Sequence, residues 1–205
     1  FIGKVGDDTY GLKFLELFKK LEIDTSLFEI DKKFKTRIVK VLRDKYGDRS
    51  FIGFEGNKYD LFADEFIDKD LLQNKISFLE RLYSQSKFIV TGTILLASVK
   101  SAEAIYFLLN YANNFKLKIV IDLNWRQVFW ENANSMENIE KEKQIKQIID
   151  YLTFADIIKL SKEEAEMFFG NINPITISKM FKKSPDVVIT NGGSPVNWFI
   201  NGYKG

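Results

Sequence analysis

Asp122, Asn124 and Arg126 stand at alternate positions directly after a short apolar run, and together they could bind a ligand. A guanidinium beside a carboxylate and an amide suits a phosphate oxygen or a sugar hydroxyl, because its fixed donors match such acceptors. The same spacing also fits a surface turn that Asp122 caps and in which Arg126 pairs with Asp122. The spacing alone leaves both interpretations open.

Ser161 and Glu164 have the spacing of a capping box at the start of a predicted helix. The functional alternative is a helix N-terminus that faces an anion, with Glu164 holding Mg²⁺ through water. Thr190 begins a second polar segment, which ends in Gly192 and Gly193. Its amides, unobstructed by side chains, could form an anion-binding nest, and a tight β-turn explains the same residues equally well.

Two further patterns admit a functional and a structural interpretation. The segment Gly6-x-Asp8-x-x-Gly11 lies between an apolar run and a helical pattern, which by itself is a weak signal of a binding loop. An aromatic cluster could stack on a base or a sugar, although such clusters commonly belong to the core. Its members are Trp125, Phe129 and Trp130.

The composition restricts the chemistry that these residues could serve. The sequence contains no Cys and no His, which excludes disulfides, thiolate catalysis, imidazole acids or bases and His-ligated metals. The net charge is only +2, which argues against a nucleic-acid partner, since such proteins usually carry a clear basic excess. No apolar run approaches the roughly 20 residues that cross a bilayer, and we find no signal peptide. We therefore expect a cytoplasmic protein with no membrane partner.

The elements that would position these residues alternate between short apolar strands and helices from residue 69 onward. Strands are predicted at 88–91, 119–121, 157–160 and 187–190, and helices at 69–83, 98–113, 139–152, 163–169 and 175–181. Buried strands that alternate with helices indicate an α/β fold, in which helices cover both faces of a mostly parallel sheet.

The first part of the chain has a different pattern. Residues 1–5 predict the end of a buried strand, and a helix follows with Asp8 as its N-cap. This helix has one apolar face, formed by Leu12, Leu15, Phe18 and Leu21. Residues 28–54 predict a β-hairpin, because 36–43 and 49–54 alternate on either side of a turn. We predict a single domain over 1–205, with this hairpin attached to it.

In an open parallel sheet, ligands bind beyond the carboxyl ends of the strands. Five polar or glycine-rich segments follow predicted strands in this sequence, at 6–8, 91–93, 122–126, 161–164 and 190–193. We expect their tips to converge at one rim of one sheet, where they would hold a polyanion and a small polyol.

Taken in this order, these segments resemble the ribokinase-like (PfkB) carbohydrate kinases, and fructokinase-like members in particular. The resemblance is carried by Phe-Ile-Gly-Lys-Val-Gly-Asp-Asp-Thr-Tyr-Gly at 1–11, Asp-Leu-Asn-Trp-Arg at 122–126, Ser-Lys-Glu-Glu at 161–164 and Ile-Thr-Asn-Gly at 189–192. The third segment fits the family's Asn-x-x-Glu pattern with Ser161 at the Asn position. The match spans essentially the whole chain.

The resemblance implies a ribokinase-like three-layer α/β/α sandwich with a small β-lid, which the hairpin at 28–54 would form or adjoin. It implies phosphoryl transfer from ATP to a sugar hydroxyl with Mg²⁺, so that a sugar and ATP would be the partners. A lid would exclude water from the reaction. A homodimer through the lid is a further expectation, because an exposed hairpin edge can pair.

The resemblance also assigns site residues one by one. Asn124 and Arg126 would bind the sugar or a phosphate, Gly92 would lie near the sugar, and Glu164 would take part in metal binding through water. The nucleotide would be bound by Lys159, Ser161, Thr190 and Gly192.

Departures from the family pattern shape the expected activity. In the family, a Gly-Ala-Gly-Asp segment carries the catalytic base. The sequence contains no such segment. We therefore expect the base beyond Gly205 and no catalytic residue in this chain. The family's N-terminal strand is also missing, and we therefore expect a fragment, cut at both ends, with little or no activity. The alternative is a noncatalytic sugar- or nucleotide-binding protein of the same fold. An NAD-dependent enzyme is disfavoured, because no Gly-x-Gly-x-x-Gly follows a strand.

Overall fold

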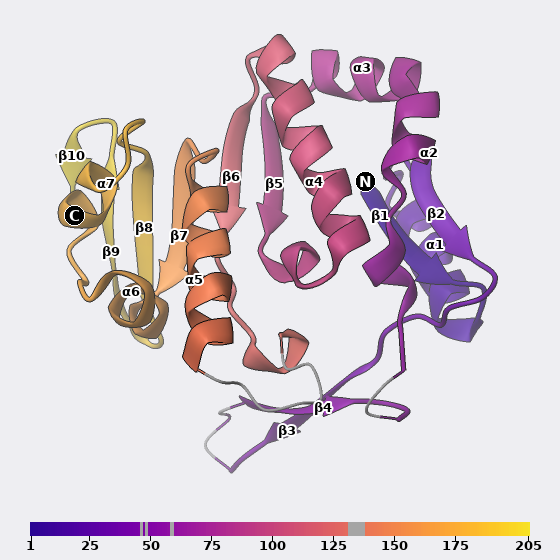
Figure 1. Ribbon diagram of the computed structural model, residues 1–205, viewed down its shortest axis with the longest axis horizontal. Coiled ribbons are helices and arrows are strands. Elements are labelled where there is room, and N and C mark those ends of the chain that lie inside the picture. Colours follow the sequence, from indigo (N-terminus) through magenta and orange to yellow (C-terminus); the bar gives the residue numbers. More distant parts are fainter. Residues whose placement is uncertain (46, 48, 58–59, 131–137) are drawn as a thin grey trace.

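A six-stranded sheet forms the centre of the computed structural model, which describes residues 1–45, 47, 49–57, 60–130 and 138–205 (Figure 1). The strand order is β10-β9-β8-β7-β6-β5. The parallel strands are β5 (Phe88–Gly92), β6 (Lys118–Asp122), β7 (Ile157–Ser161) and β8 (Asp186–Asn191). The antiparallel strands β9 (Ser194–Ile200) and β10 (Tyr203–Lys204) extend the sheet past β8. The prediction of an α/β fold with a mostly parallel sheet is confirmed, although β9 was not predicted.

Helices connect the parallel strands and supply much of the core. They are α4 (Val99–Ala112), α5 (Asn138–Leu152), α6 (Lys162–Phe169) and α7 (Pro174–Lys179), and α4 and α5 lie in front of the sheet in Figure 1. Short 3₁₀ turns occur at Ala63–Phe66, Ile94–Ala97, Asn113–Phe115 and Gln127–Phe129. The innermost strands bury alternate apolar residues almost completely: Ile119, Ile121, Ile158 and Leu160. This burial fixes the register, and with it the position of each strand end.

The helix predicted over 69–83 is in fact two helices, α2 (Lys69–Asn74) and α3 (Ile76–Gln85). Lys75 separates them with φ −103° and ψ 30°, outside the helical range. Its ammonium donates to the carbonyl of Ser26 at 3.2 Å, so that this junction is tied to the segment before β2.

A second, smaller sheet contains the parallel strands β1 (Ile2–Gly6) and β2 (Leu27–Asp31), which α1 (Thr9–Lys20) connects. The prediction that the hairpin starts at residue 28 is therefore wrong. Leu27 and Glu29 are buried, and the ammonium of Lys4 in β1 lies 3.1 Å from the carboxylates of both Glu29 and Asp31. These ion pairs support the pairing of β2 with β1, in a sheet separate from that of the hairpin.

Asp8 caps α1 as predicted, and its side chain accepts from the amides of Tyr10 and Gly11. The predicted apolar face of this helix is only partly covered, however: the ring of Phe18 packs against Phe1 and Phe28, with centroids 4.9 and 5.4 Å apart. Gly11 is the only residue of α1 that is buried, while Leu12 and Leu21 are more than half exposed. The amphipathic pattern identified the helix correctly but did not reveal what covers its apolar side.

The hairpin consists of β3 (Val39–Arg43) and β4 (Arg49–Phe54), which pair antiparallel. Its base is anchored by Arg37, whose guanidinium contacts Asp64 at 2.9 Å and Glu65 at 2.7 Å. The same guanidinium lies over the rings of Phe54 and Phe62, 4.6 and 4.5 Å from their centroids. The hairpin thus has a defined attachment to the rest of the molecule.

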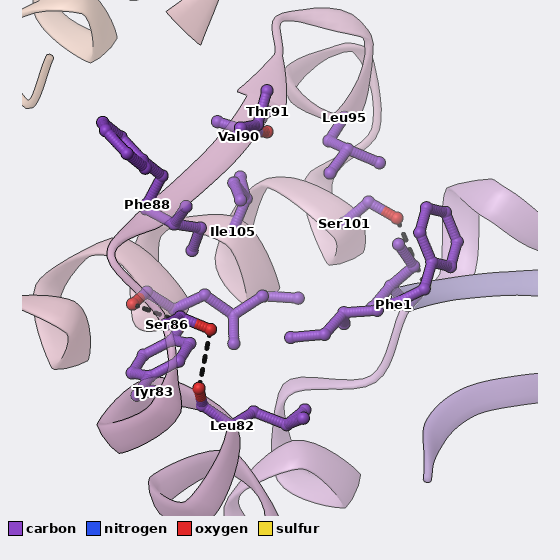
Figure 2. A pocket seen from close by; sticks show the side chains of 15 residues that line it. Phe1, Leu82, Tyr83, Ser86, Phe88, Val90, Thr91, Leu95, Ser101 and Ile105 are labelled. Atoms are coloured by element: carbon purple, nitrogen blue, oxygen red, sulfur yellow. Dashed lines mark hydrogen bonds between the residues drawn. The ribbon is translucent and has the colours of Figure 1, made fainter. Parts of the chain in front are cut away.

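An apolar cavity of about 260 Å³ lies between the two sheets (Figure 2). Its lining includes Ile2 of β1, Val90 of β5 and side chains from α3 and α4. Among the residues that the structure describes, each of these strands has a hydrogen-bonded neighbour on one side only, because β5 ends its sheet and β1 pairs with β2 alone. Among the helices that the structure describes, none is long and apolar enough to cross a membrane.

Candidate functional site

The carboxyl ends of β5, β6, β7 and β8 bring four of the five predicted segments to one rim. The register pairs Gly92 with Asp122, Asp122 with Lys159, and Ser161 with Thr190. β5 and β6 end level with each other, whereas β7 continues two residues further to Ser161 and ends beside Thr190 of β8.

The fifth segment, 6–8, does not lie on this rim, and that part of the prediction is wrong. It follows β1, which in the described part of the chain pairs with β2 in the separate sheet and with no other strand. Its carboxylate, Asp8, instead accepts a hydrogen bond from the amide of Thr36 at 2.7 Å. This segment therefore joins α1 to the chain that leads into the hairpin.

Arg126 does not pair with Asp122, so that the expected ion pair of the surface-turn interpretation is not present. Asp122 contacts the ammonium of Lys159 at 3.0 Å, and the two side chains are 41% and 38% exposed. The guanidinium of Arg126 donates to the carbonyl of Trp125 at 2.8 Å and lies 4.7 Å from the ring centroid of Phe51 in β4. No carboxylate in the described part of the chain pairs with Arg126. Among the described residues, its remaining donors thus have no carboxylate partner, and an anion or a hydroxyl could accept hydrogen bonds from them.

Asn124 lies between these residues in a left-handed backbone conformation, with φ +42°. This conformation is unfavourable for most residues that have a side chain, and Asn tolerates it best. Within the described ranges, the side-chain amide of Asn124 has no hydrogen-bond partner. The turn thus carries both the side-chain amide of Asn124 and the guanidinium of Arg126.

Glu164 forms the predicted capping box with Ser161. The Ser161 hydroxyl accepts from the amide of Glu164 at 3.2 Å, and one Glu164 oxygen accepts from the amide of Ser161 at 2.7 Å. The other oxygen accepts from the amide of Trp125 at 2.6 Å, and the residue is only 8% exposed. Both oxygens are therefore already bonded to backbone amides.

This arrangement does not make a direct metal site. Among the residues that the structure describes, no group of three or more acidic side chains could hold a metal ion. Mg²⁺ usually keeps several waters and takes one or two carboxylates together with phosphate oxygens. A cation at this rim would accordingly be held mainly by its ligand and by water.

Thr190 and Gly192 lie where β8 turns into β9, which confirms the β-turn interpretation of this segment. Asn191 pairs with Ser194 across the turn, and Gly192 has φ +53°, which favours glycine. A side chain at Gly192 or Gly193 would meet no atom within 4 Å. The turn therefore borders open space beside the other strand ends.

Gly92 and Thr93 hold the end of β5 close to β6. A Cβ atom on Gly92 would lie 3.3 Å from the carbonyl oxygen of Asp122, so that glycine permits the close approach. The fully buried hydroxyl of Thr93 donates to the carbonyl of Leu123 at 2.5 Å. The sequence placed Thr93 in a loop segment but gave no signal of this contact.

The aromatic cluster is part of the core. Trp125 stacks on Trp130 with ring centroids 5.2 Å apart and meets the edge of Phe168 at 5.6 Å. Trp130 is buried, and Phe129 packs against Phe54 of the hairpin at 4.9 Å. These rings fix the turn at 122–130 between α6 and the hairpin.

Comparison with known proteins gives consistent matches. The family profile described as pfkB family carbohydrate kinase matches residues 1–204. The chain is 26% identical over 211 residues to probable fructokinase-7 of Arabidopsis thaliana, an alignment that covers 100% of this chain and 56% of that protein. The chain therefore spans little more than half the length of this curated relative.

Solved structures show the same fold. Fructokinase with bound ATP from Xylella fastidiosa matches with a TM-score of 0.79 and 20% identity, over 100% of this chain and 59% of that one. Fructokinase from Vibrio cholerae O395 in its fructose-, ADP- and calcium-bound form matches with a TM-score of 0.75 and 20% identity, over 100% and 61%. The ribokinase-like α/β fold that the sequence predicts is confirmed.

Proposed function

Because this chain belongs to the pfkB family of carbohydrate kinases, we propose that it carries the rim at which a sugar kinase transfers a phosphoryl group from ATP to a sugar hydroxyl. The observation that carries this proposal is the presence of Asn124 and Arg126 on the same rim as Lys159 and the open turn at Gly192. Phosphoryl transfer depends mainly on positioning and electrostatics, which amides, cations and backbone donors can supply without His or Cys.

We assign the rim residues to two groups. Arg126 and Asn124 would bind the sugar or the transferred phosphate, and Gly92 would lie near the sugar. The nucleotide would be bound by Lys159, Ser161, Thr190 and Gly192. Fructokinases related to this chain have been solved with ATP and with fructose, ADP and calcium, which supports a nucleotide, a sugar and a divalent cation as ligands.

We propose Mg²⁺ as the cation. When bound, it would neutralise charge on the phosphates. Glu164, whose oxygens already accept two amides, could reach it only through water. The protein's own contribution to charge neutralisation would come mainly from Arg126, because the ammonium of Lys159 is paired with Asp122.

We propose further that the β3–β4 hairpin serves as the lid. Phe51 of β4 lies over the guanidinium of Arg126, so that the hairpin already reaches the residue expected to contact the ligand. A lid at this place would shield the reacting groups from water. A homodimer through the hairpin and a cytoplasmic location stay predictions.

Nucleotide binding tests the proposal directly. We expect saturable binding of ATP with Mg²⁺ by isothermal titration calorimetry, no comparable binding of NAD⁺, and a loss of about 10-fold or more in ATP affinity for Arg126→Met. Arg43→Met, in the exposed part of the hairpin, is the matched control. Absence of ATP binding, or equal binding by both variants, would count against the proposed site.

Turnover is expected to be weak in this chain alone, because its sequence has no Gly-Ala-Gly-Asp segment. An assay of ATP-dependent sugar phosphorylation measures this, and robust turnover by the 205 residues would contradict it. The alternative, a noncatalytic sugar- or nucleotide-binding protein, predicts ATP binding without turnover even when the chain is part of a longer reading frame.

A further inference from the structure

The turn that carries Asn124 and Arg126 is held at its backbone from three sides. The amide of Leu123 donates to the carbonyl of Lys159 at 2.8 Å. The carbonyl of Leu123 accepts from the Thr93 hydroxyl at 2.5 Å. The amide of Trp125 donates to the carboxylate of Glu164 at 2.6 Å. These contacts come from β7, from the segment after β5 and from α6, so that three separate elements fix one turn.

Asn124 is the residue between these attachments, and it is the one with the left-handed backbone at φ +42°. A conformation of this kind is unfavourable for a residue with a side chain and persists where neighbouring contacts determine it. The attachments at Leu123 and Trp125 are the contacts that could do so. Without them, the turn would be free to relax and the directions of the Asn124 and Arg126 side chains would change.

Glu164 is the only charged group among the three attachments. Its carboxylate is 8% exposed and joins the amide of Ser161, at the end of β7, to the amide of Trp125, in the turn after β6. The ring of Trp125 also meets Phe168 of the same helix at 5.6 Å, which supports the same placement. Hydrogen bonds to a carboxylate are stronger than those to a neutral acceptor, and burial strengthens them further.

We infer that Glu164 is a positioning residue, which sets the turn at Asn124 and Arg126 against the segment at Ser161. Its carboxylate acts directly on two backbone amides, and any approach to a metal ion would pass through water. The identity of the ligand that Asn124 and Arg126 hold rests on the proposed function, whereas the placement of the turn does not.

Three variants separate this role from metal binding. Glu164→Gln has one acceptor oxygen in place of two, so that it cannot serve both amides. Glu164→Asp keeps the charge at the start of α6 but is one methylene shorter, which prevents it from reaching Ser161 and Trp125 together. Glu163→Gln makes the same change of charge at the neighbouring exposed position and is the matched control.

Hydrogen exchange at the Trp125 amide is the readout that does not depend on any ligand. We expect exchange at Trp125 to become about 10-fold faster or more in Glu164→Asp and Glu164→Gln, relative to amides in β7, and to stay unchanged in Glu163→Gln. Thermal unfolding establishes that each variant is folded. If Glu164→Gln does not fold, Glu164→Asp provides the measurement. Unchanged exchange at Trp125 in a folded Glu164 variant would overturn the inference.

ATP affinity provides the functional readout, measured once with Mg²⁺ and once in EDTA. A positioning role predicts that the Glu164 variants lose affinity by a similar factor, about 10-fold, under both conditions. A loss that occurs only with Mg²⁺ present, or that a high Mg²⁺ concentration restores, would assign Glu164 to the metal and overturn the inference. If the unaltered chain binds no ATP, the proposed function fails for this chain, while the exchange measurement still decides the role of Glu164.

Discussion

At the scale of single residues, Asn124 has the least favourable backbone conformation among the proposed ligand-binding residues, with φ +42°. The stability of variants at this position tests how firmly the conformation is held. Asn124→Ala should destabilise the chain by about 1 kcal/mol more than Asn124→Gly, because glycine adopts positive φ without steric cost. Urea unfolding of both variants measures the difference. Equal stabilities would show that the turn relaxes to negative φ when Asn is removed.

Asp8 makes stability depend on pH. Burial alone would raise the pKa of Asp8, but hydrogen bonds from the amides of Thr36 and Gly11 outweigh it and hold the pKa below its ordinary value of 3.8. A lowered pKa in the folded state means that the unfolded state takes up protons first as the pH falls. The stability that Asp8 contributes is therefore complete above its ordinary pKa and is lost as the pH falls through the lower, folded value.

Asp8→Asn should reduce this dependence, since Asn can cap the helix but does not titrate. We expect the urea midpoint of the unaltered chain to fall more steeply than that of Asp8→Asn as the pH falls below 3.8. Asp7→Asn, at the exposed neighbouring position, should behave like the unaltered chain. Parallel curves for all three proteins would rule out a contribution from Asp8.

Local residue patterns predicted the helix caps correctly, but they could not predict contacts between residues far apart in the sequence. Asp8 as an N-cap and the box of Ser161 with Glu164 depend on residues two or three positions apart, which the sequence displays. The contact of Glu164 with Trp125 joins residues 39 positions apart. It exists only because β6 and β7 are neighbours, and strand order is a property of the folded sheet.

At the scale of elements, the hairpin depends on Arg37, because one guanidinium serves Asp64, Glu65 and the rings of Phe54 and Phe62. Arg37→Lys should destabilise this attachment by about 1–2 kcal/mol, since lysine cannot pair with two carboxylates and lie flat on aromatic rings at the same time. Faster hydrogen exchange throughout β3 and β4 would reveal it.

Arg43→Lys is the control for this variant, because Arg43 lies on the exposed part of the same hairpin. Its exchange rates and thermal midpoint should match those of the unaltered chain. If Arg37→Lys also leaves both unchanged, the hairpin is held by its aromatic contacts alone.

The sequence predicted which segments form helices and strands better than it predicted which segments pack or pair with one another. The alternation at 36–43 and 49–54 correctly indicated two antiparallel strands. Residues 27–31 have a similar pattern, but their pairing with β1 depends on Lys4, a residue far away in the sequence. In the same way, the pattern of α1 showed an apolar side without indicating that Leu12 and Leu21 remain exposed.

At the scale of the whole molecule, β5 ends the main sheet and carries exposed apolar side chains. Phe88 and Val90 are 49% and 69% exposed, and the strand contains no charge and no proline. Natural proteins usually protect such edges with charges, bulges or proline, since an unprotected edge pairs with other chains. We therefore expect concentration-dependent association through β5.

Val90→Lys should reduce this association, because a charge on the edge opposes pairing with another strand. Val99→Lys introduces the same charge at a similarly exposed position on α4 and is the matched control. Light scattering over a range of protein concentrations should show less association for Val90→Lys than for Val99→Lys. Identical curves would place the association at another surface, such as the exposed side of α1.

The stacked pair of Trp125 and Trp130 gives the chain an optical probe at its own ligand rim. The sequence has only 3 tryptophans, and the third, Trp198, lies in β9, near the opposite side of the sheet from β5. In Trp198→Phe, all indole emission and the excitonic circular dichroism of two rings 5.2 Å apart would come from the turn that holds Asn124. Changes in that turn could then be followed in real time without attaching a dye.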